Sequence, residues 1–161
     1  ENVDNITYNL AGPVDESYLK DLKKLEGWNK VNYKGKISYD EVKFIYSNST
    51  IGVAVHVYSK NMDGKRGNLA NTKLFEYMNW ELPIICTDFS LWKEIIEKDI
   101  KCGICVNPYD INGITNAINY LIDNPDEALQ MGKRGREAVK NKYNWDVLTK
   151  KLVSFYKEIE K

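Results

Sequence analysis

Hydrophobic residues follow two spacings along this chain, and their alternation predicts strands separated by helices. Strands are predicted at 5–13, 31–37, 51–57, 83–87 and 102–107, and the run 51–57 is apolar almost throughout, as is typical of a buried strand. Apolar residues at helical spacing predict helices at 16–26, 38–46, 88–97, 111–122, 125–142 and 145–159, and another that begins at 71 or 72. We therefore expect an α/β, Rossmann-like fold, with a parallel sheet covered by helices on both faces and 51–57 as its central strand.

Size and charge limit the classes of function. The chain has 161 residues, of which 43% are hydrophobic, enough for one domain with a core. Lys and Arg together number 23, as do Asp and Glu, so the formal net charge is zero. That balance argues against a domain that binds nucleic acid through bulk charge, but it is compatible with binding of a small anionic ligand.

Several features favour a cytoplasmic protein. The apolar runs are too short to span a bilayer, and no secretory signal opens the sequence. Three cysteines, an odd number, favour reduced thiols. Cys102 and Cys105 have the spacing of a redox or zinc pair, but no second pair completes a metal site and His56 is the only histidine. We therefore interpret the two cysteines as part of a strand.

The segment from Gly67 to Asp88 carries the strongest indication of a ligand site. Asn71 or Thr72 can cap a helix there, and the unpaired N–H groups of a first helical turn attract phosphate. Glu76 lies one turn beyond Thr72, about 5.4 Å along the helix, and a carboxylate can accept hydrogen bonds from both hydroxyls of a ribose. This spacing suits a nucleotide. The alternative, which residue type alone favours, is a solvated surface glutamate.

For several other polar residues we favour a structural or solvated role over ligand binding. Lys65 and Arg66 lie in the loop 58–69, where open α/β sheets bind ligands, but charged loop tips are usually solvated. His56 ends the expected central strand and is interpreted as structural, without a catalytic role. Tyr39 follows a strand and can stack on a base, although packing is the more frequent role of such a tyrosine.

The run Asn71-Thr-Lys-Leu-Phe-Glu-Tyr-Met, followed by Pro83-Ile-Ile-Cys-Thr-Asp, resembles the signature of an enzyme family. It is similar to a helix and strand in the nucleotide-sugar-binding half of retaining glycosyltransferases with the GT-B fold, family 4 or glycosyl transferases group 1. Other elements match that family in order and spacing over nearly the whole chain. The resemblance implies a single donor-binding domain over 1–161, whose C-terminal helix is 144–161, and no N-terminal acceptor domain. We therefore interpret the chain as a fragment of a longer protein.

The resemblance also implies roles for individual residues. Glu76 would bind the donor ribose, and Lys73 matches a lysine that is common in the motif. Asn68 stands where the family usually has a glutamate that contacts the donor sugar, and an amide there brings no charge. Glu81 stands where the family usually has glycine, and no catalytic residue is assigned. The residues implied at the donor site are Gly12, near the cleft, Ile37 and Tyr39, beside the nucleobase, and Asn68, Asn71, Thr72, Lys73 and Glu76.

The function implied by the resemblance is transfer of a hexose, with retention of configuration, in cell-surface polysaccharide synthesis. The donor would be a nucleotide sugar, with UDP favoured over GDP, and the acceptor a saccharide or a lipid-linked saccharide bound by the missing domain. No cofactor or metal is expected, because helix N–H groups and basic side chains can stabilise the departing diphosphate and no Asp-x-Asp element is present. Nucleic acid is not an expected partner, peripheral membrane association of the full protein stays open, and the chain alone is expected to be inactive.

Two alternatives remain. A nucleotide-sugar 2-epimerase would use the same architecture as half of its active site. A non-catalytic, flavodoxin-like binding or signalling module would need clustered acidic residues after the first strand, and Leu10-Ala-Gly-Pro13 supplies none.

Overall fold

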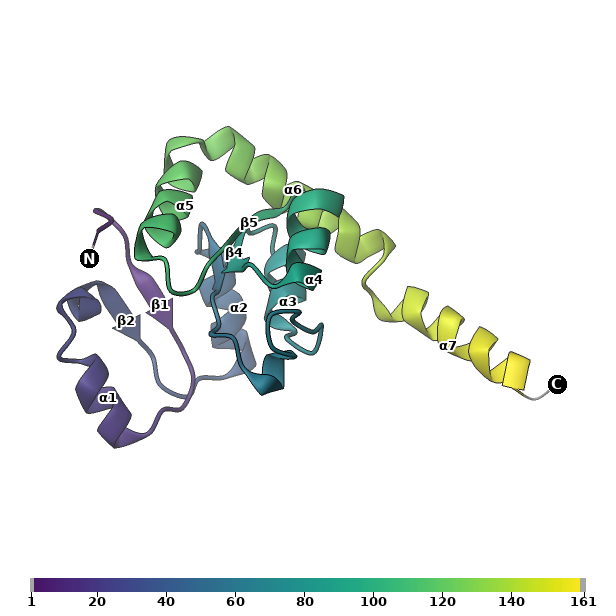
Figure 1. Ribbon diagram of the computed structural model, residues 1–161, viewed down its shortest axis with the longest axis horizontal. Helices are drawn as coiled ribbons and strands as arrows, with labels where there is room; N and C mark the ends of the chain where they lie inside the picture. Colours follow the sequence, from purple (N-terminus) through teal and green to yellow (C-terminus); the bar gives the residue numbers. More distant parts are fainter. Residues whose placement is uncertain (1, 160–161) are drawn as a thin grey trace. The chain divides into compact units, whose positions relative to one another are not determined.

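The computed structural model describes residues 2–159, and contacts divide the chain into two compact units (Figure 1). The N-terminal unit is Glu1–Ser49 and the C-terminal unit is Thr50–Lys161. Each unit has its own parallel sheet. The single donor-binding domain expected over 1–161 stays a prediction, and residues 160 and 161 of its expected last helix lie outside the described residues.

The N-terminal unit has one two-stranded sheet with helices beside it. Its elements are β1 (Tyr8–Leu10), α1 (Glu16–Leu22), the 3₁₀ helix η1 (Glu26–Lys30), β2 (Val31–Tyr33) and α2 (Tyr39–Ser47). The strands pair in parallel, with Tyr8 opposite Val31. Ser38 begins α2 with a capping box, because its hydroxyl accepts the N–H of Glu41 while the Glu41 carboxylate accepts the N–H of Ser38. Of the two residues that the sequence offers as the cap of this helix, Ser38 and Asp40, Ser38 therefore fills the role.

Helix α1 is shorter than the predicted helix at 16–26. Asp15 caps it by accepting the N–H groups of Ser17 and Tyr18, but the helix ends at Leu22. Leu25 is already extended, with φ −69° and ψ 136°. Tyr18 and Leu25, two of the apolar residues that predict a helix over 16–26, are 59% and 58% exposed. Helices this short depend on tertiary packing, and no such burial supports the last turn.

The C-terminal unit contains most of the helices. Its elements are β3 (Gly52–Ala54), the 3₁₀ helix η2 (Lys60–Met62), α3 (Lys73–Asn79), β4 (Ile84–Thr87), α4 (Ser90–Trp92), the π-helix η3 (Lys93–Asp99), β5 (Gly103–Val106), α5 (Ile111–Asp123), α6 (Pro125–Asn141) and α7 (Trp145–Ile159). All predicted elements are found, but the strands are shorter than their predicted ranges. The predicted helix at 88–97 is divided between α4 and a π-helical continuation.

The five strands form two parallel sheets in place of the one sheet expected. The order is β1–β2 in one sheet and β3–β4–β5 in the other. The centre of the three-stranded sheet is β4, and β3 is at its edge, so the prediction of 51–57 as the central strand is wrong for this sheet. The physical reason is burial: every residue of β4 is buried, whereas Ile51, Val53 and Val55 are only half-buried.

Helices cover both faces of the three-stranded sheet (Figure 1). Ile84 and Cys86 of β4 pack into a cluster with Leu74 and Met78 of α3, Phe89, and Trp92 of α4. Ile85 points to the opposite face and packs with Leu121 of α5 and Ala128 of α6. This alternation follows from the two-residue period of a strand. The predicted helices on both faces are therefore confirmed for this unit.

A close approach between α6 and the turn after α3 fixes the C-terminal end of α3. Glu81 in that turn has a left-handed backbone, with φ 56°. A Cβ placed on Gly132 of α6 would lie 1.9 Å from the Glu81 carbonyl oxygen. Only glycine allows this contact, and the left-handed conformation of Glu81 is one that glycine adopts at lower cost.

The cysteines lie in or beside the core. Cys102 is fully buried, and the Cys105 sulfur lies 3.6 Å from that of Cys86 on the neighbouring strand. The hydrogen bond to Cys105, together with burial, holds the pKa of the Cys86 thiol well above its ordinary value. Burial raises the pKa of Cys102 to about 12. These environments suit structural thiols.

Helix α7 leaves its apolar residues exposed. Trp145 is 77% exposed, and the other exposed apolar residues of this helix include Leu148, Leu152, Phe155 and Tyr156. None of the helices in the part of the chain that the structure describes has the length and apolar character that a membrane crossing requires.

Candidate functional site

The candidate site is formed by the loop that leads into α3 and by the first turn of that helix. Thr72 is the residue before α3, but its backbone is already helical and its side chain forms no capping bond. The side-chain oxygen of Asn71 instead accepts the N–H of Lys73 at 3.1 Å. Of the two caps that the sequence allows, Asn71 therefore supplies the bond.

Thr72, Lys73 and Glu76 are brought together on one face of α3. The Thr72 hydroxyl donates to Oε1 of Glu76 at 3.1 Å, and Nζ of Lys73 lies 3.0 Å from Oε2. The Glu76 side chain is 25% exposed and that of Lys73 is 50% exposed. Glu76 is thus a half-buried, hydrogen-bonded carboxylate and not the fully solvated one of the alternative interpretation.

This arrangement offers a cation and an acceptor side by side. Lys73 can approach a phosphate, while a carboxylate held on the same face can accept hydroxyl hydrogens. Ion pairs on a protein surface contribute little to stability, so a ligand can compete for both partners at small cost. The site is chemically suited to a ligand that carries an anionic group next to a pair of hydroxyls.

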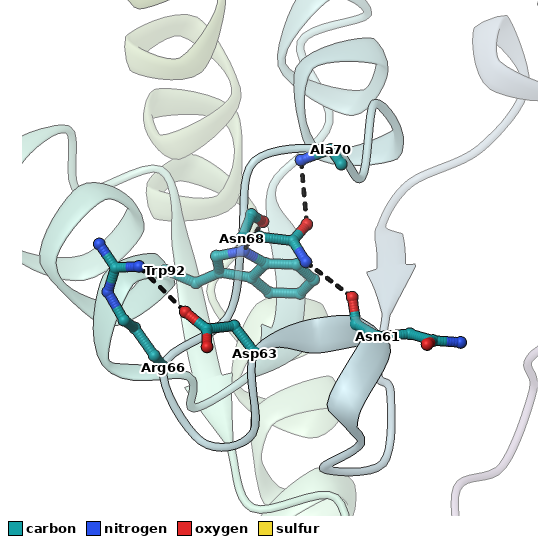
Figure 2. Close-up of polar contacts among 6 residues, drawn as sticks. All are labelled: Asn61, Asp63, Arg66, Asn68, Ala70 and Trp92. Carbon is teal, nitrogen blue, oxygen red and sulfur yellow. Dashed lines mark hydrogen bonds and ion pairs between the residues drawn. The ribbon is translucent and has the colours of Figure 1, made fainter.

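Asn68 has contacts of a different kind. Figure 2 shows its amide between two backbone groups: Nδ2 donates to the Asn61 carbonyl at 2.8 Å, and Oδ1 accepts the N–H of Ala70 at 3.0 Å. Its own carbonyl accepts the indole N–H of Trp92 at 2.7 Å. These bonds tie Asn68 to the loop and to α4. A role in contacting the donor sugar stays a prediction, and it would require the amide to exchange these partners.

The loop before Asn68 carries the two basic residues considered in the sequence. Arg66 pairs with Asp63 at 3.0 Å (Figure 2), and Nζ of Lys65 lies 5.3 Å from the centre of the Tyr58 ring. The Arg66 side chain is 70% exposed. Both contacts suit the interpretation of this loop tip as solvated.

A pair that sequence reasoning missed lies beside this loop. The Tyr58 hydroxyl donates to Oδ1 of Asp88 at 2.5 Å, and this hydrogen bond raises the pKa of Tyr58 to about 12. The ring of Tyr109 packs edge-on against that of Tyr58. Their positions in the sequence could have indicated that these residues lie close together, because they follow the carboxyl ends of β3, β4 and β5, which meet at one edge of a parallel sheet.

His56 is linked to the same loop through Asn71. The Thr87 hydroxyl accepts the N–H of His56 and donates to its carbonyl, both at 2.7 Å. Nε2 of the His56 ring lies 2.7 Å from Nδ2 of Asn71. Partial burial lowers the pKa of His56 below its ordinary value. Sequence reasoning assigned His56 a structural role but had no signal for its contact with Asn71.

The remaining predicted site residues belong to the N-terminal unit. Gly12 has φ 135°, donates its N–H to the Gly35 carbonyl at 2.8 Å and accepts the Tyr33 hydroxyl at 2.9 Å. Tyr39 is 64% exposed, with Nζ of Lys43 4.7 Å from the ring centre, and Ile37 is half-buried. The exposed ring of Tyr39 differs from the packed one that the sequence favoured. The proposed contacts of these residues with a nucleobase stay predictions.

Comparison with protein families gives one match over most of the chain. The family described as Glycosyl transferases group 1 matches residues 1–138. The MMP alpha-(1->4)-mannosyltransferase of Mycolicibacterium hassiacum is 25% identical over 76 residues, which are 47% of this chain and 18% of that protein.

Solved structures share the fold. Sucrose-phosphate synthase from Thermosynechococcus elongatus superposes with a TM-score of 0.73 and 21% identity, over 94% of this chain and 38% of that one. WaaG, a glycosyltransferase involved in lipopolysaccharide biosynthesis, gives a TM-score of 0.65 and 14% identity, over 86% of this chain and 35% of that one. The chain spans 18% to 38% of the length of these three proteins. The predicted fold class, α/β with parallel strands as in part of a GT-B glycosyltransferase, is confirmed.

Proposed function

The chain belongs to the glycosyl transferases group 1 family, and on that premise we propose that it binds the nucleotide-sugar donor of a glycosyl transfer reaction. The observation that carries this proposal is the group of Thr72, Lys73 and Glu76 on the first turn of α3. This group lies within the residues that match the family.

The proposed binding mode follows the spacing of these side chains. The diphosphate lies next to Lys73 and Thr72, where an ammonium and a hydroxyl can donate to its oxygens. The ribose lies about one helical turn away, where Glu76 accepts hydrogen bonds from its hydroxyls. Lys73 then exchanges its carboxylate partner for phosphate, and Glu76 exchanges an ammonium for ribose hydroxyls.

The proposed reaction is the transfer of a hexose from a nucleotide sugar, UDP ahead of GDP, to a saccharide or lipid-linked acceptor. Retention of configuration and a role in cell-surface polysaccharide synthesis are part of this proposal. The mannosyltransferase and the lipopolysaccharide glycosyltransferase that the chain resembles support it by their own reactions. The acceptor would be bound outside the residues of this chain.

We propose that donor binding needs no metal ion. A lysine beside the diphosphate supplies positive charge that a carboxylate-held Mg²⁺ would supply in other transferases. Among residues 2–159, no group of three His, Cys, Asp or Glu side chains is arranged to hold a metal. Addition of a chelator during the titration below tests this part of the proposal, because affinity should be unchanged.

The proposal is tested by titrating the 161-residue chain with UDP, GDP and ADP, followed by NMR, once without and once with a chelator. A phosphoryl mimic with Mg²⁺, titrated without the chelator, serves as the ligand of a signalling module. We expect a dissociation constant of roughly 0.1–10 mM for a nucleoside diphosphate, with shifts centred on Lys73 and Glu76. Absence of any shift with any nucleoside diphosphate at millimolar concentration contradicts the proposal, and a response to the phosphoryl mimic alone favours a signalling module.

A further inference from the structure

The loop of residues 68–71, which leads into α3, is held at both of its ends by residues that contact each other. At one end, the indole N–H of Trp92 donates to the Asn68 carbonyl at 2.7 Å. At the other end, the Asn71 amide meets Nε2 of His56 at 2.7 Å. The rings of Trp92 and His56 pack edge to face, with their centres 6.0 Å apart. His56 is therefore one of two anchors for the approach to the candidate site.

The backbone of His56 is itself firmly placed. Thr87, at the end of β4, is completely buried. Its hydroxyl bonds to both the N–H and the carbonyl of His56 at 2.7 Å. Because the hydroxyl accepts one bond and donates the other, both of its roles are used. A rigid central strand thereby positions the imidazole ring.

Hydrogen-bond roles determine which nitrogen of the ring carries the proton. The N–H of Lys73 can only donate, so the Asn71 atom 3.1 Å away is the amide oxygen. The other Asn71 atom, facing His56, is then the NH₂ group, which also can only donate. Nε2 of His56 must accept, so the ring is neutral and its proton is on Nδ1.

We propose that His56 is a positioning residue for the donor site: its neutral Nε2 holds Asn71, and Asn71 in turn holds the first N–H of α3. This inference rests on the proposed function for its ligand, but its contacts do not depend on that ligand. His56 touches no substrate in this scheme and acts only through Asn71.

Protonation of His56 disrupts this arrangement. A doubly protonated imidazole presents an N–H to the NH₂ group of Asn71, and a rotated Asn71 amide would present NH₂ to the N–H of Lys73. One hydrogen bond is lost in either case. The groups in contact with the ring are Asn71 from the loop and Trp92 from α4, while Thr87 from β4 bonds to the His56 backbone; none of these three titrates near neutral pH. On α3 itself, Lys73 and Glu76 are paired with each other.

A first experiment detects the contact between His56 and Asn71 by NMR, without a nucleotide. Because the chain has a single histidine, ¹⁵N spectra of its imidazole are unambiguous. We expect the proton on Nδ1 at pH 8. The backbone N–H signal of Lys73 should move as His56 is titrated toward acid, and it should not move in H56Q. A proton on Nε2 at pH 8, or a Lys73 N–H signal that does not move as His56 is titrated, overturns the proposal.

A second experiment measures binding in two variants. H56A removes the acceptor and should weaken nucleoside diphosphate binding about three- to tenfold at pH 8, the loss expected for one net hydrogen bond. H56Q is the matched control, because its side-chain oxygen can accept from Asn71 at any pH, and affinity should stay within about twofold of the parent. Circular dichroism shows whether H56A is folded; if it is not, the comparison of the parent with H56Q across pH decides.

The pH profile separates positioning from general packing. Parent affinity should fall as pH decreases through the His56 pKa, whereas H56Q should lose only the part that is due to titration of the ligand phosphate. Dividing the two profiles removes that ligand contribution. Identical profiles for parent and H56Q overturn the proposal. If the parent binds no nucleoside diphosphate, the proposed function fails, and with it the role of His56 in binding, while the ¹⁵N experiment still reports on the contact with Asn71.

Discussion

Nζ of Lys73 lies 3.0 Å from Oε2 of Glu76, within the first turn of α3. The two charges neutralise each other at a position where both side chains remain partly accessible to a ligand. An ion pair of this kind contributes little to the free energy of folding. Substitutions of either residue are therefore expected to change ligand binding more than stability.

Replacing Glu76 with alanine should weaken binding of UDP or GDP by about 1.5–3 kcal/mol, because charge-assisted hydrogen bonds to the ribose are lost. Calorimetry or NMR titration measures the change. E94A is the matched control, since Glu94 also pairs with a lysine on its own helix, Lys98, at 2.8 Å. If E76A is folded and binds as well as the parent, Glu76 is only a surface residue.

Replacing Asn68 with aspartate should lower stability by about 1 kcal/mol, because the bond to the Asn61 carbonyl is lost and a carboxylate faces a carbonyl oxygen. The bond from the N–H of Ala70 can still form. Thermal unfolding measures the effect. N61A is the control: the contact uses the Asn61 backbone, so that variant should unfold at nearly the parent temperature. Equal unfolding temperatures for N68D and N61A would show that the Asn68 amide does not hold the loop.

Replacing Gly132 with alanine should destabilise the chain by about 1–3 kcal/mol or more, because the new methyl group overlaps the Glu81 carbonyl on a rigid backbone. Chemical denaturation gives the free energy of unfolding. In the control G135A, on the same helix, the nearest atom to the new methyl group is Cγ of the flexible Met78 side chain at 3.2 Å, so the loss should be smaller. A G132A variant as stable as G135A would contradict the close approach between α6 and the turn after α3.

The Cys102 thiol should react slowly with an alkylating reagent at pH 8. Its pKa is raised to about 12 by burial, so the thiolate that reacts is a minor species there, and its fraction grows as pH rises toward that value. Mass spectrometry of alkylated peptides follows Cys102 and Cys86 separately. Denaturant should remove the protection of both. Rapid labelling of Cys102 in the native chain would mean that this part of the core opens readily.

The chain by itself should transfer no sugar from any nucleotide sugar to any acceptor. Placing two reactants in attack geometry and excluding water contributes about 7–11 kcal/mol to catalysis, and the acceptor side of that arrangement lies outside these residues under the proposed function. An assay with radiolabelled donor compares the chain with a longer form of the protein. Turnover by the 161-residue chain alone would contradict this prediction.

Local sequence pattern was enough to predict the elements and the centre of the candidate site. The bounds of α7 at Trp145–Ile159 and the start of α6 at Pro125 depend on residues close together in the chain. The grouping of Thr72, Lys73 and Glu76 follows in the same way from helical spacing. The order of strands and helices likewise determined the α/β class.

Features that depend on packing were decided by the tertiary structure alone. The apolar character of the strand segments did not identify β4 as the middle strand of its sheet, because strand order depends on which surfaces are buried in the folded chain. The contact of His56 with Asn71 and that of Tyr58 with Asp88 join residues 15 and 30 positions apart. A side chain's hydrogen-bond partner across such a distance is set by how strands and loops pack, and no periodicity in the sequence encodes it.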